Sequence, residues 1–210
     1  MSNWTEVAIK EAVCQVLLEM KKEQIPIGIS NRHVHLTEED FKALFPNEKI
    51  EPLKPLKQPN EYASKSVVTL KGAKGEIERV RVLGPLRRQS QVEISKTDAR
   101  TLGVNAPIRL SGDLKDASMI TLCSENGEIT IPAAIIAKRH IHMSFKEMEE
   151  LGLNMGQAVK VRVTSKERTV VLEDVEIRAG ENFVLEMHVD TDEANACDIL
   201  PNTTGSLITE

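Results

Sequence analysis

The stretch that decides the fold is Asn31-Arg-His-Val-His-Leu36, because it occurs twice. Residues 138–143 read Lys-Arg-His-Ile-His-Met, and both copies have a proline seven or eight residues upstream and an acidic, helix-like stretch downstream. A segment repeated in matching contexts indicates two related halves, each with its own small barrel. Two copies cannot form a solenoid, because solenoids need three or more units for stability.

Short strands with tight turns fill the sequence beyond these segments. In residues 66–137, apolar strand-like runs alternate with glycine-bearing turns such as Asn126-Gly127. Residues 158–177 and 182–189 show the same pattern. Evenly spaced short strands are typical of barrels and sandwiches and argue against a doubly wound α/β sheet. We therefore expect a mainly β fold of two small β-barrels capped by short α-helices.

The N-terminal segment differs from the rest. Residues from Trp4 to Met20 carry apolar side chains at helical spacing, so they predict an amphipathic helix that ends before Pro26. The helix either packs on the body of the protein or serves as a detachable docking tail. The expected division is an N-terminal helix or targeting extension (1–22), barrel 1 (23–31 and 138–210), and barrel 2 (32–137, with a proline-rich excursion at 46–65).

Composition excludes several classes of function. The 210 residues carry a formal net charge of −5 and only 3% aromatic residues, so a basic, base-stacking nucleic-acid surface is not expected. The three cysteines form no C-x-x-C pair, which argues against a disulfide framework or a cysteine zinc site. Neither a membrane span nor a secretory signal is visible, so the sequence predicts a cytoplasmic protein.

The histidines point to metal binding. Residues i and i+2 of a strand face the same side, so His33 with His35, and His140 with His142, each present two imidazoles to one point. Imidazole suits zinc, with copper, nickel and iron as competitors. The remaining histidine, His188, falls in an alternating run from Phe183 to Asp190, on the face opposite the apolar side chains, where it could complete a site.

An arginine-rich turn precedes a further ligand candidate. Glu93 alternates with apolar residues in a short strand, directly after a turn that contains Arg87 and Arg88. Guanidinium groups match phosphate oxygens bidentately, so this turn could bind phosphate. The sequence lacks the G-x-S-x-G, P-loop and G-x-G-x-x-G motifs, which argues against covalent serine catalysis, P-loop kinase chemistry and a Rossmann site.

Four motifs in the same order resemble a known family, the PduL-type phosphate propanoyltransferases. They are residues 31–37, 82–95, 137–143 and 188–196, and the similarity extends from residue 25 to about residue 208. The resemblance implies two small barrels with a dinuclear zinc site, where His33, His35 and Glu93 hold one ion and His140, His142 and His188 hold the other. It also implies that Arg87 binds phosphate and acts in catalysis, with Ser111 near the site.

The resemblance further implies the reaction and its setting. The expected activity is that of a phosphotransacylase, the reversible transfer of a propanoyl or acetyl group between coenzyme A and phosphate. Homo-oligomerisation and a location within a bacterial microcompartment are expected, with residues 1–20 contacting shell or cargo proteins. Propanediol degradation or another aldehyde-generating route could be the host pathway. A zinc-dependent thioester or phosphoester hydrolase and a non-enzymatic shell adaptor are the alternatives.

Overall fold

The computed structural model describes residues 6–208, so Trp4 of the predicted N-terminal helix lies outside the described residues. The chain divides into two compact units. One unit takes the chain up to Gly28, His140–His188 and the chain from Ala196 onward, and the other takes Ile29–Arg139 with Val189–Asn195. The short segment 189–195 thus packs with the second unit, although the sequence placed it in the first.

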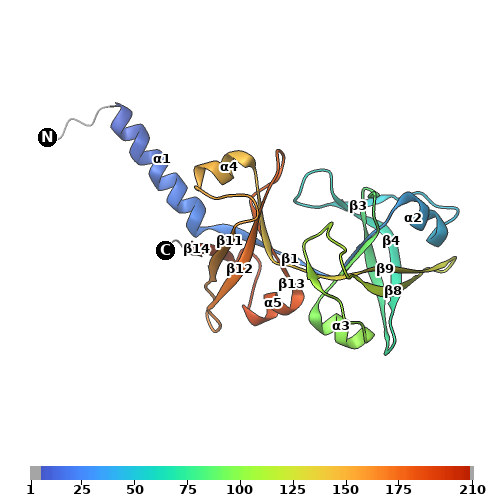
Figure 1. Ribbon diagram of the computed structural model, residues 1–210. Helices are drawn as coiled ribbons and strands as arrows, with labels where there is room; N and C mark the ends of the chain where they lie inside the picture. Colours follow the sequence, from blue (N-terminus) through green and yellow to red (C-terminus); the bar gives the residue numbers. More distant parts are fainter. Residues whose placement is uncertain (1–5, 209–210) are drawn as a thin grey trace. The chain divides into compact units, whose positions relative to one another are not determined.

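The fold is mainly β, as the sequence predicted (Figure 1). The helices are α1 (Glu6–Glu23), α2 (Glu38–Leu44), α3 (Lys96–Leu102), α4 (Phe145–Glu150) and α5 (Thr191–Ala196). The strands of the first unit are β1 (Ile25–Ser30), β10 (His140–Met143), β11 (Ala158–Val163), β12 (Val170–Ala179), β13 (Glu186–Asp190) and β14 (Thr204–Ile208). Those of the second are β2 (His33–His35), β3 (Pro52–Pro55), β4 (Tyr62–Lys71), β5 (Glu76–Gly84), β6 (Gln91–Ile94), β7 (Ile108–Arg109), β8 (Ser118–Cys123) and β9 (Glu128–Ala137).

Each unit contains a closed barrel, which leaves its strands with neighbours on both sides. Barrel 1 closes in the order β1-β13-β10-β12-β11-β14, and β14 returns to pair antiparallel with β1. Barrel 2 follows the order β4-β5-β2-β6-β9, and β8 closes the ring by pairing with both β9 and β4. The two barrels that the repeated segment predicted are therefore present.

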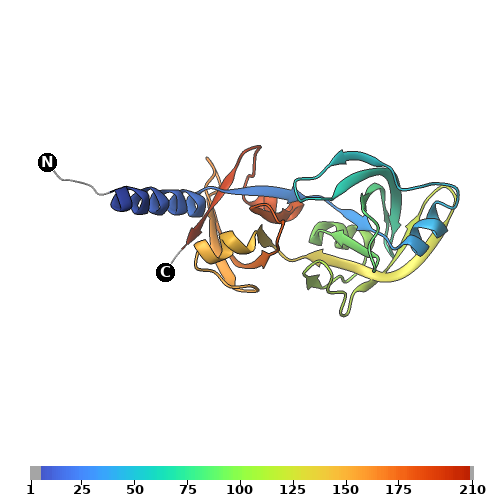
Figure 2. The same cartoon turned by 90° about the horizontal axis from the view of Figure 1, so that it is seen from above.

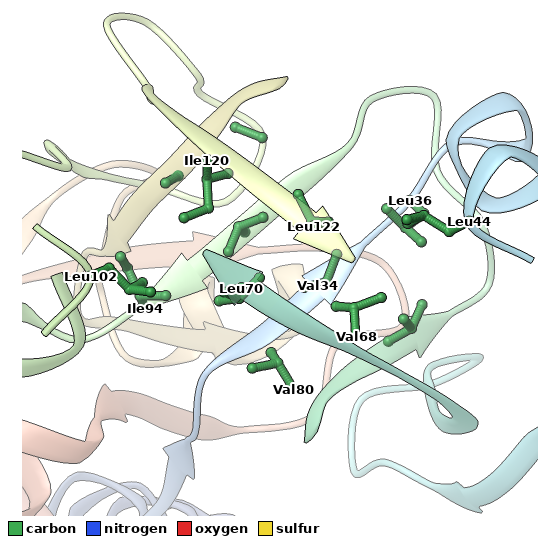
Figure 3. Close-up of a cluster of buried hydrophobic side chains, with 14 of the residues drawn as sticks. Val34, Leu36, Leu44, Val68, Leu70, Val80, Ile94, Leu102, Ile120 and Leu122 are labelled. Atoms are coloured by element: carbon green, nitrogen blue, oxygen red, sulfur yellow. The ribbon is translucent and has the colours of Figure 1, made fainter. Parts of the chain in front are cut away.

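The core of barrel 2 explains why its strands alternate. Val34 and Leu36 lie in one buried cluster with Leu70 and Leu122, which come from the opposite side of the ring (Figure 3). Leu102 of α3 closes the cluster at one end. The residues between these apolar positions face away from the cluster, so the pleat of β2 directs its two histidines out of the core.

The short helices begin where the sequence provides caps. Thr37 caps α2 by accepting a hydrogen bond from the backbone nitrogen of Asp40, and Ser144 caps α4 in the same way through Glu147. Ser95 and Asp98 form a reciprocal capping box at α3, and Gly103 ends that helix with a positive φ of 73°. Helix α3 was not anticipated, and the proline-rich excursion contains strand β3.

Helix α1 is the longest described helix, and none of the side chains in Glu6–Glu23 is buried. It leads directly into β1 (Figure 2). Its last turn is joined to the first unit by an ion pair between Lys21 and Glu150 at 3.0 Å, and by a hydrogen bond from the Ser206 hydroxyl to the Glu23 carbonyl. In the described part of the chain, no helix is both long and apolar enough to span a membrane.

Candidate metal centres

The first group of candidate ligands lies on two neighbouring strands of barrel 2. Strand β2 pairs antiparallel with β6, so that His33 lies opposite Glu93 and His35 lies opposite Gln91. Directly opposed residues face the same side of a sheet, and so do residues two apart along one strand. The four side chains therefore share one face of two adjacent strands.

Three of these side chains form a compact triad. One ligand atom from each of His33, His35 and Glu93 lies within 4.8 Å of the other two, and all three residues are buried. Two imidazoles and a carboxylate are a donor set that suits zinc and related divalent ions. The structure thus brings together the three residues that the sequence assigned to one ion.

The ring nitrogens of this triad are consistent with metal binding. His33 Nδ1 lies 2.8 Å from the carbonyl oxygen of Asn31, to which it donates, so in the neutral ring the lone pair is on Nε2, which lies 3.6 Å from Glu93. His35 is only 2% exposed, and its Nδ1 is buried without a hydrogen-bond partner. A buried polar atom of this kind is costly unless it has a ligand, so the triad fits a metal ion.

The surrounding charges act differently on the three members of the triad. Burial, followed by the positive charges of His33 and Arg87, lowers the pKa of His35 to about 2, so its ring is neutral at physiological pH. Burial also opposes ionisation of Glu93, but the neighbouring His33 more than offsets it, and the pKa of Glu93 is lowered. For His33 the opposing effect of burial is outweighed by the Glu93 carboxylate, so its pKa is raised.

The predicted phosphate residue lies beside the triad. Arg87 is half-buried, and its guanidinium donates to the Glu61 carboxylate at 2.7 Å and to the Ser111 hydroxyl at 3.1 Å. The same hydroxyl accepts a hydrogen bond from Gln91 at 2.8 Å. The neighbouring Arg88 is exposed. Of the two arginines in the turn, therefore, Arg87 is the one held next to the triad.

The second triad repeats this arrangement in barrel 1. Strand β10 pairs antiparallel with β13, so that His140 lies opposite His188 and His142 lies opposite Glu186. Ligand atoms of the three histidines lie within 4.8 Å of one another. The Glu186 carboxylate is 2.8 Å from His188 Nε2. All six ligand candidates named from the sequence thus occur in two triads.

The local structure of His188 differs from the expectation. Strand β13 begins at Glu186, so Phe183 and Leu185 lie before it and do not form the predicted alternating face. Both faces of the strand are shielded, because Glu186 and Asp190 are buried along with the apolar residues between them. The absence of a side chain at Gly28 of β1 leaves room for the buried Glu186, because a β-carbon there would lie only 2.8 Å from the Glu186 carboxyl carbon.

The two triads have equivalent strand contexts. Strand β2 has β5 as a parallel neighbour and β6 as an antiparallel one, and β10 has β12 and β13 in the same two roles. A capped helix follows each His-x-His strand. The internal repeat in the sequence therefore corresponds to a repeat in topology.

Sequence reasoning missed three polar side chains around these triads. They are Glu61, which pairs with Arg87, Gln91, which contacts Glu93, and Glu186, which contacts His188. The alternation of Gln91 with Val92 and Glu93 was the available signal for one of them. Glu186 offered the same kind of signal, because it lies two residues before His188, whereas Glu61 is joined to Arg87 only by a tertiary contact.

Comparisons with known proteins identify the family of this chain. The family model described as phosphate propanoyltransferase matches residues 26–200. Several curated relatives carry the name phosphate propanoyltransferase. The one from Levilactobacillus brevis is 50% identical over 97% of this chain and 98% of its own, and the one from Limosilactobacillus reuteri is 51% identical over 83% and 82%. The one from Salmonella typhimurium is 48% identical over 90% of each chain.

With two histidine-rich triads on paired barrel strands and relatives of this similarity, the chain is an enzyme of the phosphate acyltransferase class. The matches extend over nearly the whole chain, including both barrels and both triads. The chain belongs to the phosphate propanoyltransferase family.

Proposed function

We propose that this enzyme transfers a short acyl group, propanoyl or acetyl, reversibly between coenzyme A and phosphate, and that each triad holds one zinc ion. The observation that carries the proposal is the connection of Arg87 to Glu93 through Ser111 and Gln91, which joins a phosphate-matching guanidinium to a metal-ligating group. Family membership supplies the reaction class, and the triads supply the donor atoms.

The zinc proposal rests on the donor sets. His33, His35 and Glu93 would hold one ion, and His140, His142 and His188 the other. Zinc bound by three protein ligands supplies Lewis-acid chemistry, by polarising a carbonyl group or stabilising a thiolate. The residues of the chain hold its ligands in position: Asn31 fixes the tautomer of His33, and Glu186 contacts His188.

Arg87 is proposed to bind and orient phosphate. Its guanidinium presents a planar fork of donors that suits two phosphate oxygens, and its pairing with Glu61 shows that it accepts an anionic partner in this position. A phosphate oxygen then attacks the thioester carbonyl, a carbon–oxygen bond forms, the carbon–sulfur bond breaks, and coenzyme A leaves as the thiolate. Holding two substrates in line can lower the barrier by roughly 7–11 kcal/mol.

The test is coenzyme A release from propanoyl-CoA and acetyl-CoA, with and without phosphate, on metal-replete and chelator-treated protein. We expect release to require both phosphate and metal and to yield acyl phosphate. Release without phosphate would support the hydrolase, and no release would support the adaptor. Arg87→Ala should raise the KM for phosphate by roughly 10–100-fold, as expected for losing a hydrogen bond to a charged group.

Arg88→Ala is the matched control, because Arg88 is exposed in the same turn. It should leave the KM for phosphate unchanged. An Arg87→Ala enzyme with the phosphate dependence of the parent would contradict the role given to Arg87, while leaving the reaction itself in place.

We further propose that α1 is a docking segment for shell or cargo proteins of a bacterial microcompartment. Its apolar side chains, among them Val7, Val13 and Leu17, are each more than half exposed. Solvent-exposed apolar residues at helical spacing are suited to a groove on a partner. Deleting residues 1–20 should abolish co-purification with shell proteins while the rate of acyl transfer is retained.

A further inference from the structure

Gln91 makes a complete set of contacts around the first triad. Its side-chain nitrogen donates to Glu93 Oε1 at 2.5 Å and to the Ser111 hydroxyl at 2.8 Å. Its side-chain oxygen accepts a hydrogen bond from the backbone nitrogen of Gly112 at 2.7 Å. The residue is 2% exposed, so water does not substitute for these partners.

These contacts fix the orientation of the amide. The Gly112 backbone nitrogen is a donor and the Glu93 carboxylate is an acceptor, so only one of the two flipped forms of the amide satisfies both. Both amide hydrogens and the amide oxygen are then used. Gln91 cannot be exchanged for a residue that only donates or only accepts without leaving a partner unsatisfied.

The position of Gln91 in the strands accounts for its reach. It lies opposite His35 and two residues from Glu93 on the shared face of β2 and β6. The loop with Ser111 and Gly112 approaches this face from elsewhere in the sequence, and Ser111 also contacts Arg87. A single side chain therefore contacts both a metal-ligand candidate and the loop next to the phosphate arginine.

We infer that Gln91 is a positioning residue that holds Glu93 in its ligating orientation and, through Ser111 and Gly112, sets the place of Arg87 relative to the triad. This inference rests on the proposed function, because it assigns Glu93 to a metal and Arg87 to phosphate. Without the amide, Glu93 loses the donor that restrains one oxygen, and the 111–112 loop loses two of its hydrogen bonds to β6.

The first measurement is zinc affinity in full-length protein carrying His188→Ala, which leaves the first triad as the complete one. Competition with a chelator of known affinity measures the remaining ion directly, without reference to activity. Gln91→Met keeps the length and volume of the side chain but removes its hydrogen bonds. We expect zinc affinity to fall by about 10–100-fold, the range for losing a group that orients a ligand.

Gln157→Met in the same background is the matched control. Gln157 also accepts a hydrogen bond from a backbone nitrogen in a turn, that of Asn154, but it lies in the unit of barrel 1. It should leave zinc affinity unchanged. If Gln91→Met does not fold, Gln91→Asn, which keeps the amide but shortens its reach, should weaken zinc binding in the same direction.

The second measurement separates positioning from a purely structural role. In the chain with His188 intact, Gln91→Met should raise the KM for phosphate while leaving the KM for propanoyl-CoA unchanged. Unchanged zinc affinity and phosphate KM, with only a lower melting temperature, would overturn the inference. Absence of zinc from the His188→Ala protein itself would overturn the proposed metal site and this inference together.

Discussion

At the scale of single residues, Glu186 occupies in barrel 1 the place that Gln91 occupies in barrel 2. Each lies opposite the second histidine of its His-x-His strand, and each contacts the third member of the triad. The difference lies in charge, because the triad with a carboxylate among its ligands has a neutral neighbour, whereas the triad of three imidazoles has a carboxylate neighbour. Each site thereby gains one negative charge.

Replacing Glu186 with Gln should weaken zinc binding at the second triad. The substitution keeps the shape of the side chain but removes the charge that faces His188 at 2.8 Å. We expect a loss of about 10–100-fold in affinity, measured by chelator competition in a Glu93→Ala background. Equal affinity with Glu or Gln at this position would show that the charge of Glu186 has no part in holding the ion.

The three cysteines should differ sharply in reactivity. Cys14 is exposed, whereas Cys123 and Cys197 are buried. Burial also raises the pKa of Cys123, and its thiol donates to the Glu128 carboxylate, so little thiolate forms there at pH 8. A thiol-reactive dye should label one cysteine quickly in native protein, and Cys14→Ser should remove that fast phase. A fast phase that persists in Cys14→Ser would contradict this ranking.

At the scale of elements, the short helices α2, α3 and α4 each begin at an N-capping side chain. Helix α3 has only seven residues, too few for stability from helix propensity alone, so its cap and its packing decide whether it forms. Asp98 serves the capping box and also forms an ion pair with Arg32 at 2.8 Å. The helix start is thereby tied to the chain just before β2.

Ser95→Ala should destabilise the protein by about 0.5–2 kcal/mol, because the hydroxyl that caps the backbone nitrogen of Asp98 is lost. Ser95→Gly should cost less, since glycine is tolerated at the cap position. Urea unfolding followed by circular dichroism measures both. A larger loss for Gly than for Ala would indicate that packing of the side chain, and not capping, accounts for the effect of Ser95.

Sequence could predict the elements that carry a local signal. The His-x-His repeat predicted both pairs of histidines, and the acidic stretches downstream of the two copies indicated helices, which are α2 and α4. Helix α3 was missed although Ser95 and Asp98 form a readable capping box, because its seven residues are too few for a clear period. The run before β13 alternates like a strand, yet pairing begins only at Glu186, since strand ends are set by partners.

The residues that surround the candidate ligands were harder to predict from the sequence. The acidic residues are numerous, and nothing local distinguishes Glu61 from the others, because its contact with Arg87 joins positions 26 apart. Glu186 lies two residues before His188, but its place opposite His142 follows from strand register. Gln91 could have been suspected, because it shares the strand face of Glu93, but only the fold brings Ser111 and Gly112 to it.

At the scale of the whole molecule, the two units differ in how continuous they are in sequence. The unit of barrel 2 is nearly continuous, because Ile29–Arg139 contains all of its strands. Segment 189–195 adds contacts from outside this range, such as the ion pair between Arg139 and Glu193 at 2.7 Å. The unit of barrel 1 is formed by sequence segments that precede and follow residues 29–139.

A fragment of residues 29–139 should therefore fold independently and bind a single zinc ion. It contains a complete apolar core and the whole first triad, and its length is typical of an independent domain. We expect a cooperative urea transition that shifts to higher urea with added zinc, because a ligand of the native state stabilises it. The same fragment with His35→Ala should show the transition without the shift. A fragment with no cooperative transition would show that segment 189–195 is required.

The pairing of β1 with β14 also dictates an order of assembly during protein synthesis. Strand β1 leaves the ribosome early, but its partner around residues 204–208 is made only after every other strand of both barrels. Ile29–Arg139 can thus acquire its structure while translation continues, since domains generally fold as units in order of synthesis. Until the last strand arrives, β1 has an unpaired edge, and nascent chains stalled before residue 204 should depend most on chaperones.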